Sequence, residues 1–129
     1  MKVGDTLPVL EKTFTTVDLF AYGAATWDWH RLHYDVELAR SKGFPGPVID
    51  GQMYGALFAR VAMSWAGPRG FISSMSLRMK SIAFAGDTLR VEGAVSAIEG
   101  GVAVLSQRML NAGRVCADAT TRVRLSATS

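Results

Sequence analysis

The residues of this chain that are best suited to chemistry lie in one short stretch, TWDWHRLHYD, at residues 26–35. It contains both histidines of the chain, His30 and His33, and also Asp28. An aspartate and a histidine can hold one water molecule between them, so that one group removes a proton while the other delivers one. Asp28 and His33 are five positions apart, which would place them about 140° apart on a continuous helix. The pair therefore converges only if the chain turns between the two residues.

The same stretch also allows a structural interpretation. Asp28 would be a suitable N-cap of a following helix, and His33 could be a packed histidine bonded to a carbonyl group. His30 has aromatic and charged neighbours, and we expect it at the surface or rim. Two histidines at this spacing permit metal binding, but no third and fourth ligand is evident beyond common aspartates, so we expect no metal. Cys116 lies within a regular strand pattern, which favours packing over nucleophilic catalysis.

A second feature is the segment GPVIDGQMYG at residues 46–55, where a long apolar helix is expected to begin. The first backbone N–H groups of a helix lack intrahelical partners, and the helix dipole helps them to stabilise a developing oxyanion. Gly51 would let a ligand approach the backbone closely. Asp50 is expected to be the N-cap of this helix, and Gly51 is also explained by steric convenience alone. The two interpretations are compatible.

Two short helices are expected before this point. The segment TTVDLFAYGAAT at residues 15–26 has Thr15 or Thr16 as a possible cap, and Asp18 suits its positive N-terminal end. The segment DVELARSKG at residues 35–43 has Asp35 as its N-cap. Residues 5–14 contain a short apolar stretch interrupted by a proline, which is typical of an edge strand.

The segment DGQMYGALFARVAMSWAG at residues 50–67 predicts the long helix, which Gly67 and Pro68 end. Its polar residues Gln52, Arg60 and Ser64 lie on one narrow line, and the rest of its surface is apolar or small. A helix that is apolar over so much of its circumference is expected to be buried on most sides.

The second half of the chain is strand-like. Apolar and polar residues alternate over residues 74–80, the phase then changes near Lys80 and Ser81, and this change predicts a bulge or bend. Three further strands follow, separated by turns at 86–87, 100–101 and 111–113. Short turns require antiparallel neighbours. We therefore expect an α+β fold with a single domain over residues 1–129, in which an antiparallel sheet wraps around one long buried helix, the hot-dog arrangement. Such a sheet is too narrow to close, so a second subunit is expected to cover its edges.

Composition limits the possible partners. The chain has 129 residues, 49% of them apolar and 19% charged, with a net charge of +3, which is typical of a globular domain. No basic run alternates with aromatic residues, so we expect no nucleic-acid partner. The single cysteine cannot form an internal disulfide, and neither a signal peptide nor a membrane-spanning stretch is visible. These observations predict a cytoplasmic protein without a membrane partner.

The stretch YGAATWDWHRLHYDVELARSKGF resembles the signature of the MaoC-like, R-specific enoyl-CoA hydratases and dehydratases, whose pattern is D-x-N-P-x-H. Asp28 and His33 occupy its aspartate and histidine, whereas His30 and Arg31 replace its Asn and Pro. The segment PVIDGQMYGAL is similar to the His-Gly start of the family's central helix, with Asp50 in place of His and Gly51 retained. The segment LRMKSIAFAGDTLRVEGAV is similar to a family strand that ends in Gly-Asp-Thr, and the short segment SWAGP resembles acyl dehydratases that work as paired unlike subunits.

The resemblance implies a hot-dog fold and, as substrate, a thioester of coenzyme A or of acyl carrier protein. It implies reversible hydration of a trans-2-enoyl thioester, with Asp28 and His33 as the acid–base pair and the Gly51 N–H polarising the thioester carbonyl. No metal or redox cofactor is required. It also implies a homodimer or a hetero-oligomer with a related hot-dog chain. Two alternatives remain: a subunit whose sister chain carries the main catalytic pair, and a hot-dog acyl-CoA thioesterase.

Overall fold

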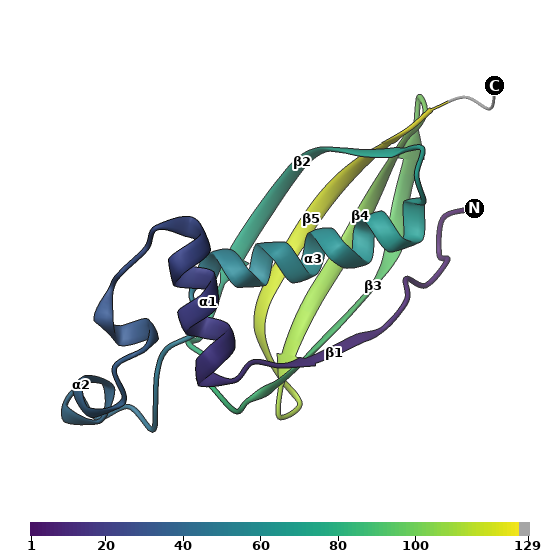
Figure 1. The fold of residues 1–129 in the computed structure, drawn as a ribbon. Coiled ribbons are helices and arrows are strands. Elements are labelled where there is room, and N and C mark those ends of the chain that lie inside the picture. Colours follow the sequence, from purple (N-terminus) through teal and green to yellow (C-terminus); the bar gives the residue numbers. More distant parts are fainter. Residues whose placement is uncertain (127–129) are drawn as a thin grey trace.

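A five-stranded antiparallel sheet curls around one long helix in the computed structural model, which describes residues 1–126 (Figure 1). The strands are β1 (Leu10–Thr13), β2 (Gly70–Met79), β3 (Thr88–Glu99), β4 (Val102–Asn111) and β5 (Arg114–Leu125). The helices are α1 (Thr16–Thr26), α2 (Val36–Ser41), α3 (Gly51–Ala66) and a 3₁₀ turn, η1 (Arg31–His33). This is the predicted arrangement. The domain predicted over residues 1–129 includes 127–129, which lie outside the described residues.

The short elements before α3 begin where the sequence predicts. Thr15 and Asp18 form a capping box at the start of α1, because each side chain accepts the backbone N–H of the other residue, at 3.1 and 2.9 Å. Asp35 caps α2 by accepting the N–H of Leu38 at 3.0 Å. The predicted edge strand is β1, which pairs only with β3 among the described strands.

The helix α3 begins at Gly51 with Asp50 as its N-cap and ends before Gly67, as predicted. One face of α3 is buried against the concave side of the sheet and includes Tyr54 and Phe58, which are fully buried. The exposed residues of α3 form one narrow stripe that includes all three predicted polar residues: Gln52, Ala56, Arg60, Met63 and Ser64. The prediction that α3 is buried on most sides is therefore confirmed, because the other eleven residues of the helix are buried or half-buried.

The strand order is β1-β3-β4-β5-β2. The hairpins β3–β4 and β4–β5 follow from two-residue loops, in which Gly100, Gly101, Ala112 and Gly113 all have positive φ. In contrast, β2 pairs with β5 and not with the strand that follows it in the chain. The expectation that a short turn makes all consecutive strands neighbours fails here, because residues 80–87 carry the chain from one edge of the sheet to its interior.

The change of phase predicted near Lys80 and Ser81 lies directly after the end of β2. The N–H groups of Lys80 and Ser81 both donate to the carbonyl of Cys116, at 2.8 and 3.1 Å, which ends the regular ladder. The chain then passes under Tyr54, whose hydroxyl accepts the N–H of Ala83 at 2.9 Å. Ala83 in turn accepts the N–H of Ile49 at 2.9 Å, so this segment supports the chain just before α3.

The core lies between α3 and the sheet. Its largest fully buried side chains include Leu19, Ile49, Leu89, Leu105 and Met109. The only buried polar side chains among the described residues are Gln107 and Thr121, which form a hydrogen-bonded chain to the carbonyl of Phe58. None of the helices within residues 1–126 combines the length and the apolar character needed to cross a membrane.

Candidate active site

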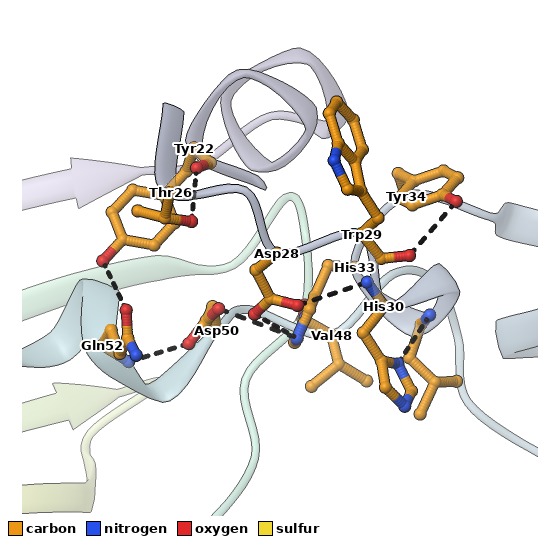
Figure 2. Close-up of polar contacts among 11 residues, drawn as sticks. Tyr22, Thr26, Asp28, Trp29, His30, His33, Tyr34, Val48, Asp50 and Gln52 are labelled. Atoms are coloured by element: carbon orange, nitrogen blue, oxygen red, sulfur yellow. Dashed lines mark hydrogen bonds and ion pairs between the residues drawn. The ribbon is translucent and has the colours of Figure 1, made fainter. Parts of the chain in front are cut away.

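Asp28 and His33 converge because the chain turns between them. The helix α1 ends at Trp27, which adopts a left-handed conformation with φ 60°, and the N–H of Asp28 donates to the carbonyl of Gly23 at 2.8 Å. The turn η1 then brings His33 back toward Asp28 (Figure 2). The His33 Nε2 atom lies 4.0 Å from Asp28 Oδ2. This distance is too long for a direct hydrogen bond and suits a bridging water.

The orientation of the His33 ring is fixed from the other side. Its Nδ1 lies 2.7 Å from the carbonyl oxygen of Val48, in the segment that leads into α3. A carbonyl oxygen only accepts hydrogen bonds, so Nδ1 carries a hydrogen and donates it. This leaves Nε2, directed toward Asp28, as the nitrogen that is available for proton transfer. The side chain of His33 is 20% exposed.

The structure adds a third group, Asp50, to the pair. Asp50 Oδ2 lies 3.8 Å from the Nε2 atom of His33, and its side chain is only 13% exposed (Figure 2). The other oxygen, Oδ1, accepts the N–H of Gln52 at 3.0 Å and so forms the N-cap of α3. Sequence reasoning missed this role because capping already explained the aspartate. The available signal was that the resembling family has a titratable histidine at this position.

The site favours the ionised form of the Asp28 carboxyl group. The pKa of Asp28 is lowered, first by a side-chain hydrogen bond with Asp50 and then by the backbone N–H of His30, which donates to Asp28 Oδ1 at 3.2 Å. The pKa of Tyr22 is raised by burial and then by the negative charges of Asp50 and Asp28. The Tyr22 hydroxyl therefore stays protonated and donates to Gln52 Oε1 at 3.3 Å (Figure 2). Tyr22 is thus linked to Asp50 through Gln52, whose N–H donates to Asp50.

Gly51 follows Asp50 directly and is the first residue of α3, so its N–H has no acceptor within the helix. A Cβ atom at Gly51 would lie 2.8 Å from the Sδ atom of Met79 at the end of β2. The flexible side chain of Met79 therefore lies close to Gly51 on the side where a side chain would project.

Of the other sequence candidates, His30 lies beside the pair, with its ring centroid 5.7 Å from that of His33, whereas Cys116 belongs to β5. His30 is exposed, and its Nδ1 accepts the N–H of Leu32 at 3.3 Å, which caps η1. Cys116 is buried in β5, and burial raises the pKa of its thiol. Both observations agree with the interpretation of His30 as a rim residue and of Cys116 as a packing residue.

The cluster offers three atoms that a cation could contact. One atom each from Asp28, His33 and Asp50 lie within 4.8 Å of one another. The sequence did not predict this third donor. The group found within residues 1–126 has three protein ligands, the number typical of a catalytic zinc site, whereas a structural zinc site uses four. The absence of a metal remains a prediction, and we interpret the three groups by their acid–base chemistry.

Comparison with known proteins identifies the family of this chain. The profile of the MaoC-like domain matches residues 3–111. The chain is 35% identical, over 89 residues, to the mitochondrial 3-hydroxyacyl-acyl-carrier-protein dehydratase of Arabidopsis thaliana. The match covers 69% of this chain and 52% of that relative, so the chain spans about half the length of the protein it matches.

Two solved structures share the fold over nearly the whole chain. The ChsH1–ChsH2 complex of Mycobacterium tuberculosis contains a chain with a TM-score of 0.91 and 25% identity, covering 98% of this chain and 99% of that one. The (R)-hydratase of A. caviae involved in PHA biosynthesis also has a TM-score of 0.91 and 25% identity, with 98% of both chains covered. The extent of the profile match and these two likenesses show that the chain is a hot-dog protein that belongs to the MaoC-like domain family.

Proposed function

We propose that this chain is a hydro-lyase that adds water reversibly across the double bond of a trans-2-enoyl thioester. One observation carries the proposal: Nε2 of His33 and Oδ2 of Asp28 face each other across 4.0 Å, with Nδ1 of His33 held by a carbonyl group. This gap fits one water molecule that contacts both groups. The family and the names of its hydratase and dehydratase relatives support the same reaction.

The pair supplies both proton transfers. One group removes a proton from the water as its oxygen bonds to C3 of the substrate, and the π electrons of the C2–C3 bond move toward the thioester carbonyl. The other group then delivers a proton to C2 as the electrons return. Asp28 and His33 suit these roles because carboxyl and imidazole groups are among the side chains that serve as general acids and bases in enzymes. No metal or redox cofactor takes part in these steps.

The start of α3 supplies the complementary charge. The Gly51 N–H is free of intrahelical partners and lies beside the cluster, where it would polarise the thioester carbonyl and stabilise the enolate-like state. Loss of one such donor costs about 10²–10³ in rate. The substrate would be an acyl thioester of coenzyme A or of acyl carrier protein, and the similar dehydratase of Arabidopsis thaliana is named for acyl-carrier-protein substrates.

We also propose that the chain works with a second hot-dog chain, like or unlike. The edge strand β2 has no neighbour on its outer side among the described strands, and Phe71 and Met79 on it are 64% and 50% exposed. An unlike partner is supported by the likeness to a chain of the ChsH1–ChsH2 complex. In that arrangement the sister chain would complete the acyl-binding surface.

The test is hydration of crotonyl-CoA by the purified chain, followed as loss of the enoyl absorbance, with free thiol measured in the same sample. Loss of absorbance without thiol release supports the proposal. Thiol release at the same rate would identify a thioesterase and contradict it. If the single chain is inactive and gains activity with a sister chain, the unlike-subunit form is supported.

A further inference from the structure

Two carboxyl groups lie around a single nitrogen atom of His33. The Nε2 atom of His33 is 3.8 Å from Asp50 Oδ2 and 4.0 Å from Asp28 Oδ2. Hydration by an acid–base pair needs only one of these carboxyl groups. The second, Asp50, caps α3 through its Oδ1, but its Oδ2 beside Nε2 has no role in the reaction as described above.

Asp50 is the more firmly held of the two carboxyl groups. Its Oδ1 is fixed by the N–H of Gln52 at the start of α3, and its side chain is 13% exposed, compared with 39% for Asp28. Because the cap determines the orientation of the whole carboxyl group, Oδ2 is directed at Nε2 by the helix itself. Asp28 is more accessible and is the carboxyl group better placed to meet substrate and water.

After each turnover, the protonation states of the base and the acid differ from those at the start. When one member of the pair takes a proton from water and the other gives a proton to C2, the substrate has gained one complete water molecule. The base is now protonated and the acid has lost its proton. The starting state returns when the base loses this proton and the acid regains one, either by exchange with solvent or by passage of the proton from the first group to the second.

We propose that Asp50 is the group through which this proton returns. This inference rests on the proposed function. The proton passes between Asp28 and Asp50, whose ligand oxygens lie within 4.8 Å of each other, and between Asp50 Oδ2 and His33 Nε2 across 3.8 Å. Asp50 receives one proton and releases one, so its own protonation state is unchanged over the cycle. The relay works in both directions and thus serves hydration and dehydration alike.

The test separates the charge of Asp50 from its role as a helix cap. In Asp50→Asn the amide oxygen keeps the cap, since asparagine and aspartate are equally good N-caps, but the group no longer carries a proton. We expect kcat for hydration of crotonyl-CoA to fall about 10²-fold with no rise in KM and an unchanged melting temperature. The matched control is Asp18→Asn. Asp18 belongs to the capping box at the N-terminus of α1, away from Asp28, and its substitution should leave kcat unchanged.

A second variant tests proton transfer directly. Asp50→Ser also keeps an N-cap oxygen but leaves room for a small carboxylate. Formate added to Asp50→Ser should restore a part of the lost kcat, and it should not raise kcat of the wild type. A group that merely shapes the site would not be rescued in this way.

The outcomes distinguish this inference from the proposed function. Wild-type kcat in Asp50→Asn, with Asp28→Asn and His33→Ala strongly impaired, would overturn the relay and leave the hydratase proposal intact. A rise in KM without loss of kcat, or a failure of formate to rescue Asp50→Ser, would also overturn the relay. Loss of wild-type activity on treatment with a chelator, restored by a divalent cation, would assign the three groups to a cation instead. If the chain, alone or with a sister chain, hydrates no enoyl thioester, both proposals fail.

Discussion

The carbonyl oxygen of Asp28 lies 2.7 Å from the position that a Cβ atom would take at Gly23. Gly23 is buried in the last turn of α1, and its own carbonyl accepts the N–H of Asp28. A side chain at this position cannot be accommodated unless the backbone of Asp28 moves, because the atom in the way is backbone and not the end of a flexible chain. Gly23 thus determines where the candidate acid–base pair lies.

We predict that Gly23→Ala impairs activity more than its effect on stability explains. Overpacking of a well-packed site costs about 1–3 kcal/mol, and here the strain is relieved by displacing Asp28. The measurement is kcat/KM for crotonyl-CoA together with the melting temperature. Gly55→Ala is the matched control in α3, because a Cβ atom there meets only Leu77 Cδ2, at 3.9 Å. Equal kcat/KM in the two variants would contradict the prediction.

Tyr54 joins the central helix to the segment that supports the site. Its hydroxyl accepts the N–H of Ala83, the carbonyl of Ala83 accepts the N–H of Ile49, and the neighbouring carbonyl of Val48 accepts from His33 Nδ1. In Tyr54→Phe the buried N–H of Ala83 loses its partner, and we predict a loss of about 1–3 kcal/mol in the free energy of unfolding. Denaturant unfolding measures it. Tyr34→Phe, which removes a longer hydrogen bond to Trp29, serves as control and should change stability less.

The same phenol predicts a dependence of stability on pH. Burial raises the pKa of Tyr54 from 10 to about 12. The folded protein holds this proton more tightly than the unfolded chain, so the contribution is fully present below the unfolded pKa of 10 and is lost as the pH rises toward 12. The free energy of unfolding should therefore fall over this window by about 2–3 kcal/mol more in the wild type than in Tyr54→Phe. Parallel curves for the two proteins would contradict it.

The open edge of β2 predicts association in solution. Phe71 is 64% exposed on this strand, and we expect the chain to form a dimer, with itself or with a sister chain, that covers the edge. Phe71→Lys should shift the molecular mass measured by light scattering toward the monomer. Val17→Lys is the control, because Val17 is 74% exposed on α1 and lies far along the chain from β2. An active wild-type monomer at micromolar concentration would contradict the prediction.

Local signals account for the parts of this fold that could be predicted from the sequence. The cap at Asp50 and the stop at Gly67 bound α3, and the Gly100–Gly101 pair fixes one hairpin, because each depends on the conformation of a few adjacent residues. The pairing of β2 with β5 could not be predicted in this way, since it depends on how residues 80–87 cross the sheet.

The candidate site could likewise be predicted from the sequence only in part. The spacing of Asp28 and His33 required a turn, and the structure provides it through Trp27 in a left-handed conformation, for which a tryptophan gives no local signal. Asp50 joins the pair only through the three-dimensional arrangement of α3 and η1, so its second role was hidden behind its role as a cap.

The most direct test of the central claim is kcat/KM for hydration of crotonyl-CoA by Asp28→Asn, His33→Ala and the double variant, measured in the assembly in which the wild type is active. Each single variant should lose about 10²–10⁴-fold while remaining folded, because each removes one of the two groups that contact the water. The double variant should be little worse than the worse single one, since the pair acts as a unit. His30→Ala, at the exposed rim, should lose little. Wild-type kcat/KM in either Asp28→Asn or His33→Ala would contradict the account.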